Sequence, residues 1–296
     1  MLHYRKNLKI ALLFLFPALI VYLLFEVIPM LTSFYFAFHD WPGIKNVPLK
    51  FVGLANFKEL FTDKEFIASI KNVFLYVFWS VLTQIPIGFF IAIVLSRIQI
   101  ATRFFKAVFF FPLILPATSV FLMWNFIFFP TDAGALNHLL HSLGLSNLTR
   151  TWLVDENTAF GVVILVTTWS SFGYYMTIGL AALAGIPDEI HDSAKMDGAA
   201  GFRKLVHITL PMIWESIKIS VVFVITGVLK IFDIIFVMTN GGPNGSTQVP
   251  ATLMYEEAFK YGHYGLGSAI STVIFVISLL LTVISLKLMQ WKKEEL

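Results

Sequence analysis

The sequence has no cysteine and few charged residues. With 0 Cys among 296 residues, it can form neither disulfides nor thiolate metal or redox centres. Charged residues make up 13% of the chain, about half of the roughly 25% found in soluble globular domains. Hydrophobic residues make up 57%, and the mean hydropathy is +0.79. This composition predicts an integral membrane protein, and the small, dispersed net charge of +3 argues against nucleic acid as a partner.

Sequence motifs of enzymes are also missing. There is no G-x-x-x-x-G-K-[ST] phosphate loop, so this chain cannot hydrolyse ATP by that route. There is no H-E-x-x-H, no G-x-S-x-G and no paired Asp-rich motif within an apolar run, which argues against an intramembrane enzyme. The 7 histidines do not form a cluster of metal ligands. We therefore expect no catalytic residue, no metal site and no cofactor in this chain.

Six apolar runs are long enough for the roughly 20 residues that a helix needs to cross a bilayer. The first run follows the basic residues Arg5, Lys6 and Lys9. It is much longer than the roughly 7–15 apolar residues of a signal peptide, so we interpret it as a retained span. The sequence predicts an all-α integral membrane fold with a single transmembrane domain over residues 1–296, whose six helices cover residues 10–38, 71–95, 104–129, 158–184, 212–239 and 266–288.

Lysine and arginine are distributed unequally between the two sides of these predicted spans. Most of them lie on the side that holds both chain termini and residues 185–211. Those on the other side are fewer, and most of them lie in one longer loop mixed with acidic residues. The positive-inside rule therefore places both termini and residues 185–211 in the cytoplasm.

A polar, charged segment over residues 185–211 separates the fourth and fifth predicted spans. Pro187 suits the first position of a helix, and Asp188 and Glu189 complement the positive end of its dipole. Gly198 follows where a left-handed residue ends a helix. The pattern predicts a helix–Gly–helix loop with a small-residue surface that another protein can approach closely. The alternative is an amphipathic connector at the membrane interface.

Polar side chains form stripes along the fourth and fifth predicted spans. The fourth carries them at the spacing i, i+3, i+4, i+7 of one helix face, at Thr167, Ser170, Ser171 and Tyr174. The fifth has the spacing i, i+4, i+7, at Thr226, Lys230 and Asp233. An ionised side chain at the bilayer centre costs about 2.5–3.5 kcal/mol, so Lys230 and Asp233 should pair or face a wet cavity. The stripes predict either a path for a polyhydroxylated solute, or helix-packing hydroxyls with a structural ion pair.

The charged loop resembles the cytoplasmic coupling signature of permease subunits in binding-protein-dependent ABC importers. That signature is Glu-Ala-Ala, three residues, Gly, nine residues and Ile-x-Leu-Pro, and it stands here as Asp192-Ser193-Ala194, Gly198 and Ile208-Thr-Leu210-Pro211. Further segments, in order along the chain, are similar to maltose-type sugar permeases: Phe51–Phe57, Phe109–Pro112, Phe232–Asp233, Thr239–Pro243, Tyr255–Phe259 and Gly265–Ala269. Asp192 and Ser193 replace the usual Glu and Ala, and we expect these similar residues to preserve the shape of the loop.

The resemblance implies a permease subunit of an ATP-driven importer in the bacterial cytoplasmic membrane. An extracytoplasmic solute-binding protein would deliver a sugar, a separate ATPase dimer would bind ATP and Mg, and a second permease subunit, expected to be a different chain, would complete the pathway. Asp192 would face the ATPase, Ala194 would pack closely against it, and Gly198 would provide the turn. The implied ATPase-coupling residues are Asp192, Ser193, Ala194, Asp197, Gly198, Ala199 and Phe202.

The resemblance also places the solute along the stripes of the fourth and fifth spans. Lys230 is unexpected in a path for a neutral sugar, so it indicates either an anionic sugar, such as a uronide or a phosphorylated glycerol, or a cation that neutralises Asp233. A competing function is an ion-coupled secondary carrier that uses the Lys230–Asp233 pair. A membrane scaffold is a third, against which the polar stripes argue. The loop favours the importer, because a carrier has no use for an ATPase-docking surface.

Overall fold

A computed structural model of the protein describes residues 14–98 and 102–290, with side chains described as far as residue 287. The predicted span residues 10–13, the basic N-terminal residues and the last two lysines lie outside the described residues. The α-helices are α2 (Ile28–Phe36), α3 (Ala55–Leu60), α4 (Lys64–Arg97), α5 (Thr102–Ile114), α6 (Ala117–Ile127), α7 (Ala135–Ser142), α8 (Glu156–Ala184), α9 (Asp188–Met196), α10 (Gly201–Lys204), α11 (Leu210–Met212), α12 (Trp214–Val228), α13 (Asp233–Met238), α14 (Pro250–Tyr255) and α15 (Tyr264–Gln290).

The remaining regular elements are short. Two strands, β1 (His39–Asp40) and β2 (Lys50–Phe51), pair antiparallel. π-Helical segments cover Leu23–Val27, Leu205–Thr209 and Glu256–Lys260, and a 3-10 turn covers Ser146–Leu148. The described chain is therefore overwhelmingly helical, which confirms the predicted fold class.

Candidate membrane spans occur in the expected number. Within the described residues, four helices are long and apolar enough to cross a membrane: Phe14–Phe36, Lys64–Arg97, Glu156–Ala184 and Tyr264–Lys287. Two bent pairs also qualify, α5 with α6, bent by 95°, and Gly201–Met212 with α12, bent by 66°. Counting each bent pair as one span gives six, in agreement with the sequence.

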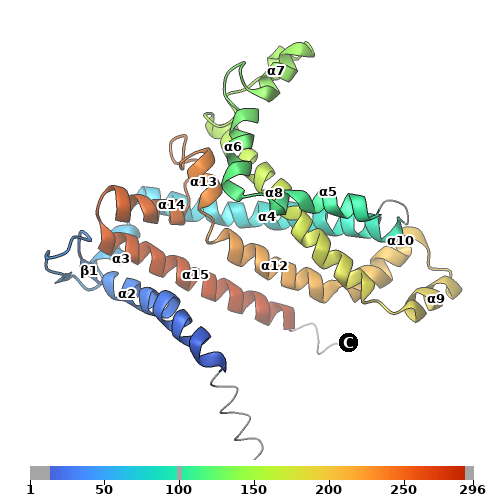
Figure 1. Cartoon of the computed structure of the whole chain (residues 1–296), viewed down its shortest axis with the longest axis horizontal. Coiled ribbons are helices and arrows are strands. Elements are labelled where there is room, and N and C mark those ends of the chain that lie inside the picture. Colours follow the sequence, from blue (N-terminus) through green and yellow to red (C-terminus); the bar gives the residue numbers. More distant parts are fainter. Residues whose placement is uncertain (1–13, 99–101, 291–296) are drawn as a thin grey trace, which may run out of the picture. The chain divides into compact units, whose positions relative to one another are not determined.

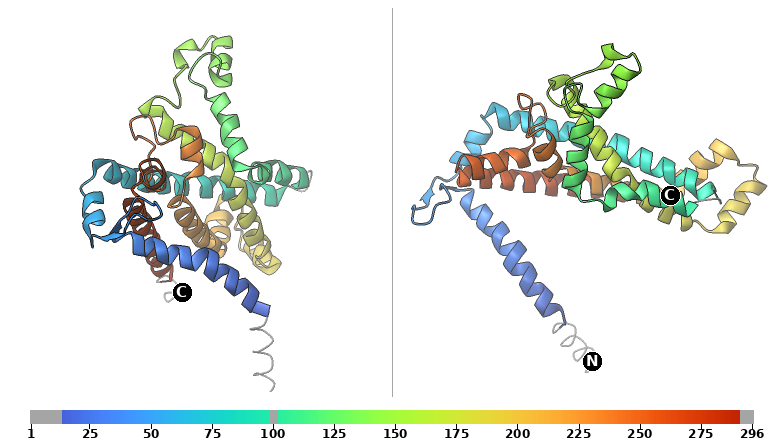
Figure 2. Two further views of the ribbon diagram at one scale, coloured as in Figure 1. Left: turned by 60° about the vertical axis from the view of Figure 1, so that its left-hand side comes forward. Right: turned by 45° about the horizontal axis from the view of Figure 1, so that its top comes forward.

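Two of the predicted spans are interrupted. The third turns sharply between α5 and α6 (Figure 2), at Leu115 and Pro116, because proline removes a backbone donor and disfavours helix at the residue before it. The fifth was expected to be one helix over residues 212–239. Instead α12 ends at Val228, four residues follow without helix, and α13 begins at Asp233.

The described residues form two compact units, and each is described by itself. The first comprises residues 14–63 and 253–275. In it the Asn56 amide is buried and donates to the carbonyl oxygens of Ala37 and His39, at 2.9 and 3.1 Å. These bonds connect α3 to the chain around β1. They give partners to buried backbone carbonyls in a region where the sheet pairs only His39–Asp40 with Lys50–Phe51. The single domain expected over residues 1–296 stays a prediction.

The second unit comprises residues 64–252 and 276–290, and its centre is the long contact between α4 and α8 (Figure 1). Glycines make this contact close. A Cβ at Gly88 would lie 2.7 Å from the Cβ of Tyr175, and one at Gly179 would lie 2.8 Å from the Cβ of Ala92. Small residues of this kind let membrane helices pack backbone to backbone, where no water drives apolar association.

Candidate solute pathway and coupling surface

A cavity of about 370 Å³ lies in the second unit, where the fifth predicted span is broken. Its walls come from α6, α8, the end of α12, the break itself and the start of α13. The residues that line it are Phe121, Thr167, Ser170, Ser171, Gly227, Lys230, Ile231, Phe232, Asp233 and Ile234. Five of the seven predicted pathway residues are therefore brought together around one space.

Helix α8 supplies the hydroxyl groups of this cavity. Thr167 Oγ1 donates to the Val163 carbonyl, and Ser170 Oγ donates to the Val166 carbonyl, each at 2.9 Å. Thr167 also shares a hydrogen bond with the hydroxyl of buried Tyr76 on α4. Bonding to the carbonyl four residues earlier satisfies the hydroxyl proton inside the helix and leaves oxygen lone pairs able to accept a bond from a solute.

The break supplies the charges. Lys230 lies within it and Asp233 begins α13, and both side chains are exposed beside the cavity. Among the described residues, the ion pairs within 4.0 Å do not include one between Lys230 and Asp233. Of the two arrangements expected from the sequence, the structure has the one in which both groups face a cavity.

Tyr174 and Thr226 do not line this cavity. Tyr174 is 39% exposed, and its ring contacts those of Tyr175 and Phe223, with centroids 5.3 and 6.2 Å apart. Thr226 Oγ1 donates to the Val222 carbonyl at 2.9 Å. The spacing of the fifth stripe assumed one straight helix, and the break after Val228 removes that register. Gly227 and Phe121, which the sequence did not single out, also line the cavity.

The loop between α8 and α12 has the predicted helix–Gly–helix form. α9 ends at Met196, and Gly198 has a φ of +69°. The Ala199 amide then donates to the Ala194 carbonyl at 2.8 Å, which closes the end of the helix. A left-handed residue is needed there, and glycine adopts that conformation without steric cost.

Most of the predicted coupling residues are accessible. Asp192, Ser193, Asp197 and Gly198 are exposed, Phe202 is 78% exposed, and Ala199 is half-buried. Ala194 differs from the expectation that it packs against another subunit, because only 3% of it is exposed. Its methyl group packs within its own chain, so it holds α9 in place and does not present a surface.

An ion pair on the exposed side of α9 fixes the charge of Asp192. Lys195 Nζ donates to Asp192 Oδ1 at 2.8 Å. This bond and the positive charge of Lys195 lower the pKa of Asp192 below its ordinary value, and the same bond raises the pKa of Lys195. Both groups therefore remain ionised at neutral pH, although solvent screens a pair that is this exposed.

Comparison with known proteins identifies the family. The profile of the family described as "binding-protein-dependent transport system inner membrane component" matches residues 84–291, which include the cavity, the break and the helix–Gly–helix loop. The chain belongs to this family. It is a permease, a membrane protein whose function is transport.

Relatives extend the similarity over nearly the whole permease. The probable ABC transporter permease protein YurN of Bacillus subtilis is 37% identical over 98% of this chain and 99% of its own length. The trehalose/maltose transport system permease protein MalF of Thermococcus litoralis is 30% identical, over 99% and 97%. A chain of a bacterial ABC transporter that imports alginate has the same fold, with a TM-score of 0.84 at 21% identity, covering 97% of this chain and 98% of that one.

These relatives confirm the resemblance drawn from the coupling signature. The permease is a subunit of an ABC importer, ATP is hydrolysed by a separate subunit, and this chain is not an enzyme. The ion-coupled secondary carrier is not favoured, because the family works with a binding protein and an ATPase.

Proposed function

We propose that the permease moves a sugar from an extracytoplasmic binding protein into the cytoplasm through the 370 Å³ cavity. The observation that carries this proposal is the meeting of three hydroxyls, an amine and a carboxylate in one space with the rings of Phe121 and Phe232. Sugars are bound by polar groups that match their hydroxyls, together with apolar faces that cover their C–H surfaces. Relatives support the sugar, since they include a diacetylchitobiose uptake permease, NgcF, and a multiple sugar-binding transport permease, MsmF.

The exposed part of the helix–Gly–helix loop then serves as the docking surface for the ATPase. Asp192, Ser193, Asp197 and Phe202 present the surface, and Gly198 makes the turn. Buried Ala194 holds α9 to the rest of the unit, and the Ala199 amide closes the end of that helix. Closure of an ATPase dimer around ATP and Mg would push on α9. Residues 185–187 join α9 to the end of α8, and α8 would carry the movement to its cavity-lining residues Thr167, Ser170 and Ser171. A second permease subunit, a different chain, would supply the other wall of the pathway.

This arrangement requires the loop and both chain termini to lie in the cytoplasm. The distribution of lysine and arginine supports that orientation. The cavity in the broken span is bordered by unwound backbone, which membrane proteins tolerate where it is buried in protein or lines a water-filled space.

The sugar is tested by reconstitution. The permease is co-purified with its partner subunits, placed in lipid vesicles and supplied with its binding protein, and ATP hydrolysis and uptake are measured with maltose, trehalose and diacetylchitobiose. We expect one of these sugars, or a related one, to stimulate both activities. Uptake that persists without ATP in vesicles holding this chain alone would contradict the proposal in favour of a carrier.

The docking surface is tested at its turn. Gly198→Pro should abolish both uptake and sugar-stimulated ATP hydrolysis, because proline cannot adopt the φ of +69° that the turn requires. Gly198→Asn is the matched control, since asparagine tolerates left-handed backbone and a Cβ at this position meets nothing within 4 Å. Normal stimulated hydrolysis in Gly198→Pro would contradict the coupling role.

One observation favours an acidic sugar as a second candidate substrate. Lys230 faces the cavity without an ion pair to Asp233, so it is available to bind a carboxylate or phosphate on a solute. A uronide that competes with the transported sugar in wild type but not in Lys230→Gln would support this candidate. Equal competition in both proteins would rule it out.

A further inference from the structure

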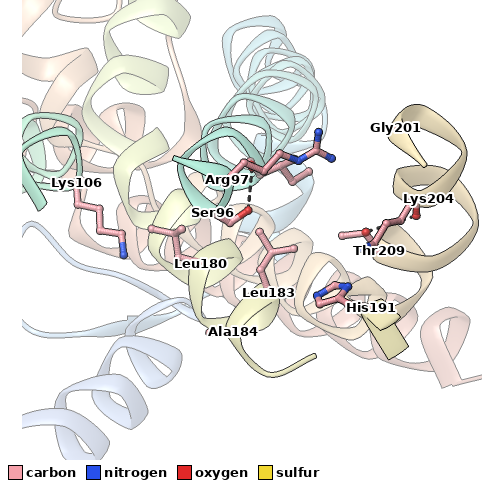
Figure 3. A pocket seen from close by; sticks show the side chains of 11 residues that line it. Ser96, Arg97, Lys106, Leu180, Leu183, Ala184, His191, Gly201, Lys204 and Thr209 are labelled. Carbon is pink, nitrogen blue, oxygen red and sulfur yellow. Dashed lines mark hydrogen bonds between the residues drawn. The ribbon is translucent and has the colours of Figure 1, made fainter. Parts of the chain in front are cut away.

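A second and larger cavity, of about 500 Å³, lies in the same unit between the membrane helices and the coupling loop (Figure 3). The end of α4, the start of α5 and the end of α8 form one side, and α9 and α10 form the other. Its lining residues are Ile93, Ser96, Arg97, Lys106, Leu180, Leu183, Ala184, His191, Gly201, Lys204 and Thr209.

The titratable groups of this cavity are all basic. Arg97, Lys106, His191 and Lys204 come from four different elements, and none of the described residues that line the space is acidic. Asp192 is close enough to sense the charge of Lys204, but its own hydrogen bond goes to Lys195. Within the described chain, the ion pairs do not involve Arg97, Lys106 or Lys204. Cations gathered from separate elements without a carboxylate leave an uncompensated positive field.

One ring nitrogen of a lining residue, buried beside the cavity, has no partner. Nδ1 of His191 is buried and makes no hydrogen bond to any described residue. Buried polar atoms in native proteins nearly always have a partner, so such an atom calls for one that is absent here. Ser96 and Thr209 already donate to the carbonyls of Ile93 and Lys204, so their oxygens add acceptors but few donors.

The rest of the wall is apolar. Figure 3 shows Leu180 and Leu183 between Lys106 on one side and Lys204 with Thr209 on the other, with the guanidinium of Arg97 above them. A small inorganic cation finds no ligand in this arrangement. An anionic group with several acceptor oxygens and an apolar body fits it, because arginine and lysine bind phosphate oxygens by charge-assisted hydrogen bonds.

We propose that this cavity binds a phosphate group, carried by an anionic phospholipid or by a soluble phosphate compound. The phosphate oxygens accept bonds from Arg97, Lys106 and Lys204, and His191 lines the same space. A bound phosphate connects α9 and α10 to the end of α4 and the start of α5, because the cations of the cavity lie on both sides of the space. His191 directly precedes Asp192 in the coupling surface, so occupancy of the cavity fixes the position of α9.

Native mass spectrometry of the full-length permease in mild detergent tests the site, by titration with phosphatidylglycerol, phosphatidylcholine and inorganic phosphate. We expect phosphatidylglycerol to bind more tightly than the zwitterionic phosphatidylcholine. The double variant Lys106→Gln/Lys204→Gln should weaken phosphatidylglycerol binding by about tenfold or more, since it removes two charge-assisted bonds.

The matched control is Arg103→Gln/Arg203→Gln. It removes the same charge from exposed neighbours on α5 and α10 that do not line the cavity, and it should leave binding within about twofold, the range of weak surface electrostatics. Lys106→Arg/Lys204→Arg, which keeps the charge, should retain binding and shows that the substituted sites still allow the chain to fold.

Competition identifies the source of the phosphate. Displacement of phosphatidylglycerol by inorganic phosphate, lost in the Lys106/Lys204 variant, assigns the site to a soluble phosphate compound. Phosphatidylglycerol binding that resists inorganic phosphate, and that is lost in the same variant, assigns it to a lipid headgroup. Equal losses of phosphatidylglycerol binding in the site and control variants would overturn the proposal, because binding would then follow the total surface charge. No loss in either variant would also overturn it, because Lys106 and Lys204 would then not hold the lipid.

Discussion

The fourth and fifth spans of the permease both carry polar residues, and they fold differently. α8 runs unbroken for 29 residues, from Glu156 to Ala184. The fifth span ends its helix at Val228 and resumes at Asp233. The hydroxyls of Thr167, Ser170 and Thr177 donate to carbonyls four residues earlier, so each finds a partner within α8 itself.

Lys230 and Asp233 form no ion pair with each other among the described residues. Lys230 and Asp233 lie where the backbone is unwound, and both face the cavity. Their charges need water, a solute or a counter-ion, each of which requires space, and irregular backbone at membrane depth is tolerated only beside such a space. The two spans therefore differ in how they accommodate polar groups: α8 satisfies its hydroxyls within the helix, and the broken fifth span leaves two charges beside the cavity. Variants of both spans test whether a solute passes this cavity.

The largest expected effect comes from filling the cavity. A Cβ at Gly227 meets nothing within 4 Å, because it points into open space. Gly227→Phe should place a ring in the pathway and reduce uptake to background, while the protein remains folded and still co-purifies with its partners. Uptake is measured in reconstituted vesicles.

Two controls accompany that variant. Gly227→Ala should leave uptake nearly unchanged and stabilise α12 by about 0.5–1 kcal/mol, the usual gain over glycine inside a helix. Gly161→Phe adds the same ring to an exposed site on α8, where a Cβ also meets nothing within 4 Å. Transport by Gly227→Phe at the level of Gly161→Phe would show that the solute does not pass this cavity.

The next effect should appear in stability. A Cβ at Gly173 would lie 2.3 Å from the carbonyl oxygen of Phe109, where α5 crosses α8. Gly173→Val should therefore force the two helices apart and cost about 1–3 kcal/mol, as overpacking does. Thermal unfolding in detergent measures the loss. Gly161→Val on the open face of the same helix is the control, and equal unfolding temperatures for the two variants would refute the close contact.

A smaller effect is expected at the charges. Asp233→Asn should raise the KM for the transported sugar by about tenfold, because a hydrogen bond to a charged group contributes about 1.5–3 kcal/mol. Assembly with the partner subunits should remain intact, since Asp233 has no ion pair to Lys230 in the structure. Transport kinetics and co-purification measure the two properties. Loss of the assembled complex would instead support a structural role, and an unchanged KM in an intact complex would show that Asp233 does not bind the sugar.

The smallest effect tests whether the hydroxyls of α8 bind the solute or only stabilise the helix. Ser170→Ala should raise KM by a few fold if Ser170 accepts a bond from the sugar, since one neutral hydrogen bond contributes about 0.5–1.5 kcal/mol. Thr177→Val removes an equivalent hydroxyl, bonded to the Gly173 carbonyl, at a position outside the cavity. Matching kinetics for the two variants would show that the stripe only stabilises α8.

The sequence was informative where a property depends on neighbours along the chain. Apolar length alone predicted six spans, and the described residues contain four unbroken helices and two bent pairs as candidates. The helix–Gly–helix loop followed from Pro187, the acidic first turn and Gly198, all of which act through local backbone preferences. A spacing of 3.6 residues holds along the regular helix α8 and brings Thr167, Ser170 and Ser171 to the cavity. Tyr174, one turn further along, contacts the rings of Tyr175 and Phe223 instead.

Tertiary structure decided the rest, because those features depend on segments that are distant in the sequence. The break after Val228 left Thr226 outside the cavity, and only the packed structure shows the open space above Gly227. The burial of Ala194 depends on what α9 packs against, and no spacing within the loop reports it. The basic cavity draws Arg97, Lys106, His191 and Lys204 from four elements. In the sequence these basic residues are far apart, and only the tertiary structure brings them to the wall of one cavity.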